Sequence, residues 1–269
     1  MSGFSVEWLT LRESYDVRAR NPVVLGAAIA RLKSKSAVRL VDLACGTGST
    51  LRSLSPQLPA RQHWDLVDND PRLLNAACAA NFAGEVDLNA VPLDLNGDLE
   101  TGLNQPSDLI TTSALLDLVS DAWLDRFARH AAARGLPVYA ALTYDGRVEL
   151  SPADPTDAAI VGAVNAHQLT DKGFGPALGP SAPAAAISRF KTLGYEIVQG
   201  NSDWMMAATD RNIQIELLNG WAGAAREMQS VSGREINDWL TRRLQAVDQC
   251  ASTMRVGHVD FFATPSTMR

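Results

Sequence analysis

A short segment near the start of the chain constrains the fold more than any other. Residues 38–44, VRLVDLA, form a largely apolar run with β-branched residues, and Gly46 and Gly48 follow it directly. Such a run is typical of a strand buried on both faces of a parallel sheet. Glycine lets the backbone bend sharply and approach a ligand closely. With a helix expected from about Thr50, the segment predicts a strand, a tight turn and a helix whose first N–H groups are free to bind a carboxylate or phosphate.

The alternation of strand and helix continues along the chain. Asp70 and Pro71 are typical of the cap and the first position of a helix that follows the second strand. The predicted strands are residues 38–44, 63–68, 86–94, 108–114, 137–144, 195–200 and 255–265, with further helices at about 120–134 and 183–193. Repeated βα units favour a Rossmann-like, doubly wound α/β fold. We therefore predict a seven-stranded, mostly parallel sheet whose last strand is antiparallel and lies toward an edge.

Three regions lie outside this alternation. At the N-terminus, Asn21 caps an amphipathic helix, and the spacing from Trp8 to Asp16 suggests a shorter helix before it. Residues 145–181 are rich in Pro, Gly and Asp, too irregular for regular structure throughout, and a loop of that length is often a lid over a site. Two amphipathic helices, the second opened by a capping box, are predicted within residues 207–250.

The composition limits the classes of function. A net charge of −6 supplies no general positive field for phosphate backbones, which disfavours a nucleic-acid substrate. The three cysteines, at 45, 78 and 250, have no metal-ligand spacing, and we expect no metal site. The N-terminus lacks the apolar core of a signal peptide, and no segment reaches the length of a membrane span. We expect one structural domain in the cytoplasm, without a membrane partner.

Asp68 narrows the ligand of the glycine turn. It ends the second strand about 20 residues after Gly48, where a carboxylate accepts hydrogen bonds from ribose hydroxyls. A turn without a ligand would explain the two glycines alone, but the glycines and Asp68 together predict an adenosine ligand. Leu51 stands where NAD- and FAD-binding turns carry a third glycine, which disfavours these dinucleotides.

The segment DLACGTGS resembles the first motif of class I S-adenosylmethionine-dependent methyltransferases, with an alanine at the commonest first glycine. LVDNDP, LDLNGD and DLITTSALLDLVS resemble the second, third and fourth motifs in the family order, so the resemblance spans about Val38 to Tyr144. The opening WLTLRESYDVRARNP is similar to an uncharacterised bacterial subgroup of that family. Together with the pattern of helices and loops, this predicts a helical cap over residues 1–34 and a methyltransferase domain over 35–269, with insertions at 145–181 and 207–250.

The resemblance also implies a cofactor, S-adenosyl-L-methionine, and the residues that hold it. The implied residues of the glycine turn, which contacts the methionine moiety, are Asp42, Ala44, Gly46 and Gly48. Asp68 and Asn69 would lie at or beside the ribose, Asp94 and Leu95 at adenine, and Ser113 at the sulfonium. For Asp94, a solvated turn residue is the alternative. Arg12 and Arg18 are candidates for binding the ligand carboxylate, although a solvated helix face explains both equally well.

Methyl transfer from a sulfonium needs an aligned nucleophile and the exclusion of water, and it needs a general base only when the acceptor starts protonated. Strand ends line the cleft in this fold, so Tyr144 and Asp145 are candidate base or orienting groups. His167, Lys172 and Phe174 are further candidates, because they lie in the long loop. Ordinary surface positions remain the alternative for the polar residues of this set.

The segment SALLDLV lacks the N/D-P-P-Y/F signature of methyltransferases that act on the amino groups of nucleic acids and glutamine. Together with the acidic net charge, this favours a small-molecule methyl acceptor. Methylation of tRNA or protein is one alternative. A non-catalytic module that binds S-adenosylmethionine is another. The sequence assigns no oligomeric state.

Overall fold

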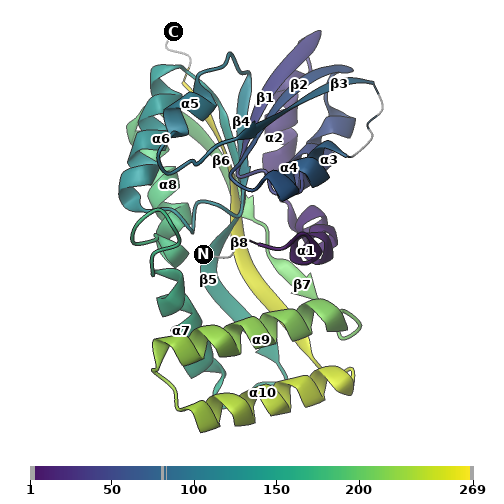
Figure 1. Cartoon of the computed structure of the whole chain (residues 1–269), viewed down its shortest axis with the longest axis vertical. Coiled ribbons are helices and arrows are strands. Elements are labelled where there is room, and N and C mark those ends of the chain that lie inside the picture. The colour runs from purple at the N-terminus through teal and green to yellow at the C-terminus, as the bar shows by residue number, and fades with distance from the viewer. Residues whose placement is uncertain (1–3, 80–81, 83, 267–269) are drawn as a thin grey trace.

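The predicted alternation of strands and helices is present in a computed structural model of the chain, which describes residues 4–79, 82 and 84–266 (Figure 1). The strands are β1 (Ala37–Leu43), β2 (Arg61–Asp68), β3 (Glu85–Pro92), β4 (Leu109–Ser113), β5 (Val138–Ser151), β6 (Tyr195–Asn201), β7 (Trp204–Met206) and β8 (Thr253–Pro265). The helices are α1 (Val6–Ala19), α2 (Pro22–Leu32), α3 (Ser49–Leu54), α4 (Pro71–Cys78), α5 (Leu99–Leu103), α6 (Asp121–Ala133), α7 (Asp157–Gln168), α8 (Ala182–Thr192), α9 (Arg211–Met228) and α10 (Gly233–Asp248), with short 3₁₀ turns at η1 (Ser55–Gln57) and η2 (Gly179–Ser181).

The sheet confirms the predicted Rossmann-like, doubly wound α/β fold. Its strand order is β3-β2-β1-β4-β5-β8-β6, and β7 pairs with β8. β1 to β5 pair in parallel, whereas β8 runs antiparallel to β5, β6 and β7. The edge position predicted for the last strand was wrong, because β8 lies between β5 and β6. In this interior position the side chains on both faces of β8 are mostly buried, so their alternation did not indicate an edge strand.

Helices cover both faces of the sheet because its central strands are apolar on both sides. In β1, Val38 and Leu40 belong to a core that includes residues of α2, α3 and α4. Val41 and Leu43 belong to a second core, formed with α5, α6 and α8. Figure 1 shows these two groups of helices on opposite sides of the sheet. Burial on both faces explains why the sequence of β1 is almost continuously apolar.

β5 and β8 continue well beyond the carboxyl edge of the parallel strands. β5 pairs with β4 only over residues 138–141, and its last residues, 148–151, pair with 253–256 of β8. A third apolar core lies on this extension, formed with α7, α9 and α10. In Figure 1 the extension leads from the sheet to the two long helices at the bottom of the view. The predicted end of the fifth strand at Tyr144 was therefore wrong, since pairing with β8 carries β5 to its end at residue 151.

Residues 145–181 are more regular than their composition predicts. Besides the end of β5, they contain the 12-residue helix α7 and the turn η2. Ile160, Ala163 and Val164 follow helical spacing and enter the third core. That spacing is present in the sequence, but the high Pro and Gly content of the surrounding residues favoured an irregular loop. At the N-terminus, α1 is also longer than predicted, with 14 residues against 11 in α2.

Local signals predicted several helix boundaries correctly. The side chain of Asn21 accepts hydrogen bonds from the first N–H groups of α2, and Asp70 caps α4 in the same way. Ser232 and Glu235 form the predicted capping box at the start of α10. These bonds join neighbours in sequence, so the sequence alone is enough to anticipate them. Within the described residues, no helix has both the length and the apolar run that crossing a bilayer requires.

A buried ionic cluster joins the N-terminal helices to the sheet. Arg20, between α1 and α2, is buried and donates hydrogen bonds to the hydroxyls of Tyr139 (3.4 Å) and Thr50 (3.2 Å). The Tyr139 hydroxyl in turn donates to Oδ2 of Asp260 on β8 (3.4 Å). The positive charge of Arg20 also acts on the buried carboxyl of Asp42, at the end of β1. A buried carboxylate without a cation nearby is costly, so Arg20 stabilises the whole cluster.

We expect Arg20→Met to lower the free energy of unfolding by about 3–5 kcal/mol, because it leaves buried carboxyl groups without their cation. Arg18→Met is the matched control, since Arg18 is exposed and lies two residues earlier. We expect a change within about 0.5 kcal/mol for that control. Urea unfolding followed by tryptophan fluorescence measures both. Equal losses in the two variants would show that the cluster does not depend on Arg20.

Candidate functional site

The turn after β1 has a backbone conformation that side chains disfavour. Gly46 and Gly48 have φ values of +55° and +84°, and Ala44 has +51°. A Cβ added to Gly48 would lie 3.2 Å from Cβ of Ala77 on α4, and one added to Gly46 would lie 3.2 Å from Leu9 on α1. Both glycines are therefore favoured by conformation and by the close packing of α1 and α4 around the turn.

Asp68 connects this turn to the end of β2. Its Oδ2 accepts a hydrogen bond from the backbone N–H of Gly46 (2.9 Å), and its Oδ1 accepts one from the backbone N–H of Asp70 (3.0 Å). Burial raises the pKa of the Asp68 carboxyl, and the two backbone bonds oppose that shift. Each carboxylate oxygen has a further lone pair. Asp68 can therefore hold the turn and still accept hydrogen bonds from a ligand.

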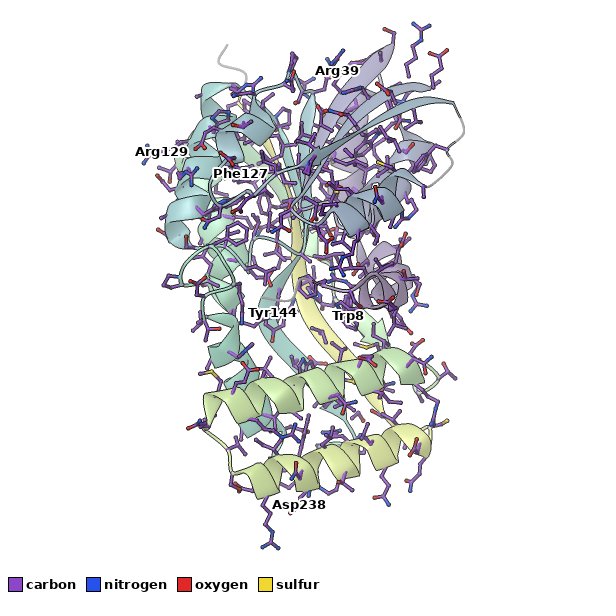
Figure 2. The ribbon with its side chains drawn as sticks, viewed as in Figure 1. Trp8, Arg39, Phe127, Arg129, Tyr144 and Asp238 are labelled. Carbon is purple, nitrogen blue, oxygen red and sulfur yellow. The ribbon has the colours of Figure 1, made fainter. Side chains whose placement is uncertain are left out.

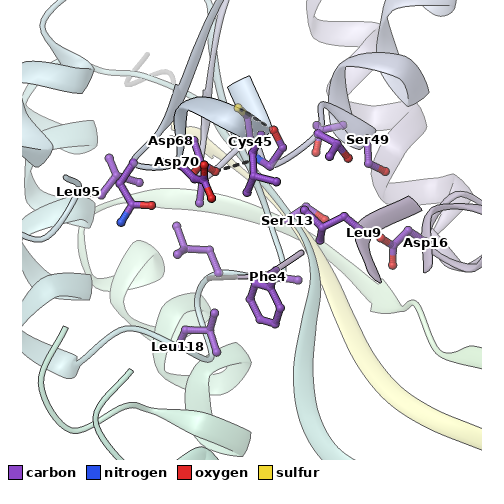
Figure 3. A pocket seen from close by; sticks show the side chains of 18 of the residues that line it. Phe4, Leu9, Asp16, Cys45, Ser49, Asp68, Asp70, Leu95, Ser113 and Leu118 are labelled. Atoms are coloured by element: carbon purple, nitrogen blue, oxygen red, sulfur yellow. Dashed lines mark hydrogen bonds between the residues drawn. The ribbon is translucent and has the colours of Figure 1, made fainter. Parts of the chain in front are cut away.

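A cavity of about 200 Å³ lies over the turn, at the carboxyl edge of the sheet. In Figure 3, Asp68 and Leu95 stand on one side of it, and Leu9 and Asp16 of α1 stand on the other. The structure brings most of the expected cofactor-site residues together here. Those that line the cavity are Arg12, Ala44, Gly46, Asp68, Asn69, Asp94, Leu95 and Ser113.

Three expected residues do not line this cavity. Gly48 is the N-cap residue of α3. Asp42 is buried behind the turn, where its Oδ1 accepts a hydrogen bond from the Thr111 hydroxyl (2.7 Å). Burial raises the pKa of Asp42 to about 7, against the opposing effects of Thr111 and Arg20. Arg18 is exposed, with its guanidinium 4.6 Å from the centre of the Tyr15 ring.

Of the two arginines proposed for the ligand carboxylate, only Arg12 lies at the cavity. Its guanidinium donates two hydrogen bonds to Asp16 (3.0 and 3.3 Å) and lies 5.0 Å from the centre of the Trp204 ring. Six residues correspond to about 1.7 helical turns, so Arg12 and Arg18 point to different sides of α1. The sequence alone could not show which arginine lies at the cavity, because the contact between Arg12 and Trp204 forms only in the tertiary structure.

A larger cavity of about 930 Å³ adjoins the first. Arg12, Asn69 and Asp94 line both. The larger cavity lies beyond the carboxyl edge of the parallel strands, with side chains of α1, β5, α7, α9 and β8 in its walls. Figure 2 shows Trp8 on α1 and Tyr144 on β5 at this level of the molecule, between the sheet and α9. The extension of β5 and β8 therefore creates the space that this cavity occupies.

The two candidate base residues at the end of the fifth predicted strand separate in the structure. Tyr144 lines the larger cavity and donates a hydrogen bond from its hydroxyl to Oδ1 of Asn165 (2.7 Å). Burial raises the pKa of Tyr144, which keeps its phenol protonated at neutral pH. Asp145 does not line either cavity, and its carboxylate binds the guanidinium of Arg147 (2.6 Å). Neighbours in a strand point to opposite faces, which explains the difference.

Three candidates from the long loop region line the larger cavity. Nδ1 of His167 lies 3.2 Å from Nζ of Lys172, and Nε2 of His167 lies 3.0 Å from a carboxylate oxygen of Glu227 on α9. Phe174 lines both cavities and packs edge-on against Trp123, with ring centres 5.7 Å apart. Residues near 167–174 therefore form one wall of the site.

Asp117 and His258 are residues of the larger cavity that the sequence reasoning missed. Asp117, in the loop after β4, is 5% exposed, and its Oδ1 has no hydrogen-bond partner among the described residues. Burial raises its pKa to about 6. His258 of β8 is 6% exposed, its Nδ1 also lacks a partner there, and burial lowers its pKa to about 3. The position of Asp117 four residues after a strand end was the one available signal, since such loops line the cleft in this fold.

Backbone strain concentrates around the two cavities. Five non-glycine residues in the described chain have positive φ, and three of them, Ala44, Ala114 and Leu142, line a cavity. Residues in this region of φ typically persist only where surrounding contacts hold them, and they often occur at functional sites. At Leu142, the backbone N–H donates to Oδ1 of the buried Asp260 (2.7 Å). That bond is one of the contacts that hold the strained conformation.

No family model matches the chain, and no curated protein matches it. Among solved structures, a cyclopropane-fatty-acyl-phospholipid synthase-like protein from Lactobacillus casei is similar over 97% of this chain and 94% of that chain, with a TM-score of 0.56 and 12% identity. The chain has the class I methyltransferase fold. A cyclopropane synthase from Mycobacterium tuberculosis (TM-score 0.49, 10% identity, 98% of this chain and 87% of that chain) and an S-adenosylmethionine-dependent methyltransferase from Thiobacillus denitrificans (0.45, 15%, 97% and 99%) resemble it less closely.

The low pKa of His258 predicts a change of stability with pH. The folded protein keeps this ring neutral, whereas the unfolded chain binds a proton on it below about pH 6.5. Its contribution to stability is therefore present above pH 6.5 and is lost as the pH falls toward about 3. In His258→Asn this contribution is absent. We expect the stability difference between the wild type and the variant to shrink by up to about 1.4 kcal/mol per pH unit below pH 6.5.

Urea unfolding of both proteins at several pH values between 4 and 7 measures this difference. Comparing the two proteins removes the contributions of the other titrating groups that they share. A difference that stays constant across the series would contradict a neutral, buried His258.

Proposed function

We propose that the chain is an S-adenosyl-L-methionine-dependent methyltransferase that acts on a small-molecule acceptor by in-line methyl transfer. The observation that carries this proposal is the pair of adjoining cavities, one over the glycine turn and Asp68 and the other lined by aromatic and ionisable side chains. Ligands bind at this edge of an open α/β sheet. Ala114 and Leu118 line both cavities, so two ligands could meet beside them.

The smaller cavity has the groups that this cofactor requires. Asp68 has lone pairs left for the ribose hydroxyls. Gly46 lines the cavity without a side chain, so a methionine moiety can approach its backbone closely. Leu95 offers an apolar wall to adenine. Arg12 retains N–H groups beyond the two that bind Asp16, and these can bind a carboxylate. When bound, the cofactor supplies a methyl group already activated by its sulfonium.

The contribution of the chain is to align the acceptor and to exclude water. α1 contributes Leu9 and Arg12 to the wall of the smaller cavity. Phe174, far from α1 in the sequence, lines both cavities. Ser113 ends β4 and lines the smaller cavity, and Ala114, the next residue, lines both cavities. In this proposal, they stand beside the reacting centre.

The dimensions and charge of the site support a small acceptor. The larger cavity, at about 930 Å³, has the size of typical small-molecule sites, which run to roughly 1,000 Å³. The net charge of −6 provides no general attraction for a nucleic-acid backbone. We therefore favour a small molecule over tRNA or protein as the acceptor.

We expect Asp68→Ala to weaken the binding of S-adenosylhomocysteine, the demethylated cofactor, by about 1–3 kcal/mol, because a ribose would lose a charged acceptor. Isothermal titration calorimetry measures the change. Asp87→Ala is the matched control, since Asp87 is an exposed carboxylate at the outer strand β3. Unchanged affinity in a folded Asp68→Ala protein would contradict the ribose assignment.

The proposed function is tested by following a labelled methyl group. The protein is incubated with S-adenosylmethionine labelled on the methyl carbon and with separate extracts of small metabolites, lipids, RNA and protein. We expect label in the small-metabolite fraction. Label in the RNA or protein fraction would contradict a small-molecule acceptor and identify RNA or protein as the substrate. Cofactor binding without any transfer would favour a non-catalytic module.

A further inference from the structure

The larger cavity has an unusually aromatic wall. Trp8, Trp204 and Trp221, three of the chain's six tryptophans, line it, together with Tyr144 and Phe174. Trp8 and Trp204 meet edge to face, with ring centres 6.4 Å apart. These residues come from α1, β7, α9, β5 and the loop after α7, so the fold gathers them from distant parts of the sequence. Aromatic walls of this kind favour stacking with a flat ring.

Asp117 is a buried carboxylate in this wall. Among the described residues, no cation that lines the cavity contacts it directly. Arg12 is bound to Asp16, Arg72 to Asp70, and Lys172 lies against His167 and Thr170. Burial, the largest effect on Asp117, raises its pKa, and its own backbone N–H, the charge of Arg12 and the N–H of Tyr144 only partly oppose this.

The free oxygen of Asp117 carries a cost unless a ligand donates to it. A buried polar atom without a partner typically costs about 1–3 kcal/mol. Oδ1 of Asp117 is such an atom, and Nδ1 of His258, in the same wall, is another. The neutral ring of His258 lies near the rings of Trp204 and Tyr144, with centres 5.2 and 6.0 Å away. The aromatic wall of this cavity therefore contains two buried polar atoms that lack hydrogen-bond partners among the described residues.

From this arrangement we propose that the methyl acceptor is a flat aromatic compound with a hydroxyl or amino group, and that Asp117 binds that group and accepts its proton. The inference rests on the proposed methyltransferase function. The bond from the methyl carbon to the acceptor oxygen or nitrogen forms while the carbon–sulfur bond breaks, and the bonding pair stays on sulfur. The O–H or N–H proton passes to Oδ1 of Asp117, which later releases it to water.

Three ligands with one ring system test the recognition step. 2-Naphthol, 2-naphthylamine and naphthalene are titrated by calorimetry or ligand fluorescence into the protein, with and without saturating S-adenosylhomocysteine. Because a hydrogen bond to a charged group is worth about tenfold or more in affinity, we expect naphthol or naphthylamine to bind at least about tenfold more tightly than naphthalene. Equal affinities for all three in the wild type would overturn the proposal.

Substitutions then assign the effect to Asp117. In Asp117→Asn, the preference over naphthalene should fall to about threefold, since a neutral acceptor gives roughly half the free energy of a charged one. In Asp117→Ala it should disappear. Asp238→Asn is the control, because it removes a carboxylate from the exposed face of α10, far from the cavity (Figure 2). A preference that survives Asp117→Ala in a protein with a normal melting transition would also overturn the proposal.

The outcomes separate this inference from the proposed function. Binding of S-adenosylhomocysteine without any preference among the three ring compounds would contradict the role of Asp117 and leave the cofactor assignment standing. Failure to bind S-adenosylhomocysteine would contradict the proposed function, while the ligand-free titrations would still report whether Asp117 recognises the donor group. The tighter of the two donors identifies whether oxygen or nitrogen is favoured as the nucleophile.

Discussion

The antiparallel pairing of β5 with β8 is the interaction on which the rest of the molecule depends. The two strands pair from Val138 opposite Ala263 to Ser151 opposite Thr253, across two irregular steps in the register. Near Val138 the paired strands belong to the main sheet. Toward Ser151 they pack against the third core, formed with α7, α9 and α10. Without this pairing there would be no wall beyond the carboxyl edge of the parallel strands. The larger cavity exists because the ribbon continues past that edge.

The same ribbon fixes the N-terminal helices over the smaller cavity. Asp260 of β8 accepts hydrogen bonds from the backbone N–H of Asn21 and from that of the strained Leu142. Arg20 supplies positive charge to this carboxylate and to Asp42. Three distant parts of the chain thus share one buried electrostatic cluster. Because breaking such a cluster leaves buried charge uncompensated, it favours a single position for α1 and for the residues that α1 adds to the site.

The two cavities differ in how their polar groups are satisfied. Around the glycine turn, Asp68 already accepts two backbone hydrogen bonds, so that region is held in place before any ligand binds. In the larger cavity, Asp117 and His258 each keep a buried polar atom without a partner in the part of the chain that the structure describes. A turn held in place in this way needs little rearrangement when a ligand binds. Unpartnered groups suit recognition of one acceptor, because a ligand that lacks the matching donor leaves them unsatisfied.

The sequence alone determined the features that depend on neighbours in the chain. The apolar run of β1, the caps at Asn21 and Asp70, and the placement of Asp68 at a strand end all follow from local propensity and local hydrogen bonds, and the doubly wound fold follows from their repetition. The tertiary structure alone decided which residues meet across long separations. β8 entered the sheet interior, β5 continued to residue 151, and Asp117 came to share a wall with His258. Strand pairing and burial between distant segments have no local signature, because each strand finds its hydrogen bonds and its apolar surroundings only on a partner far away in the sequence.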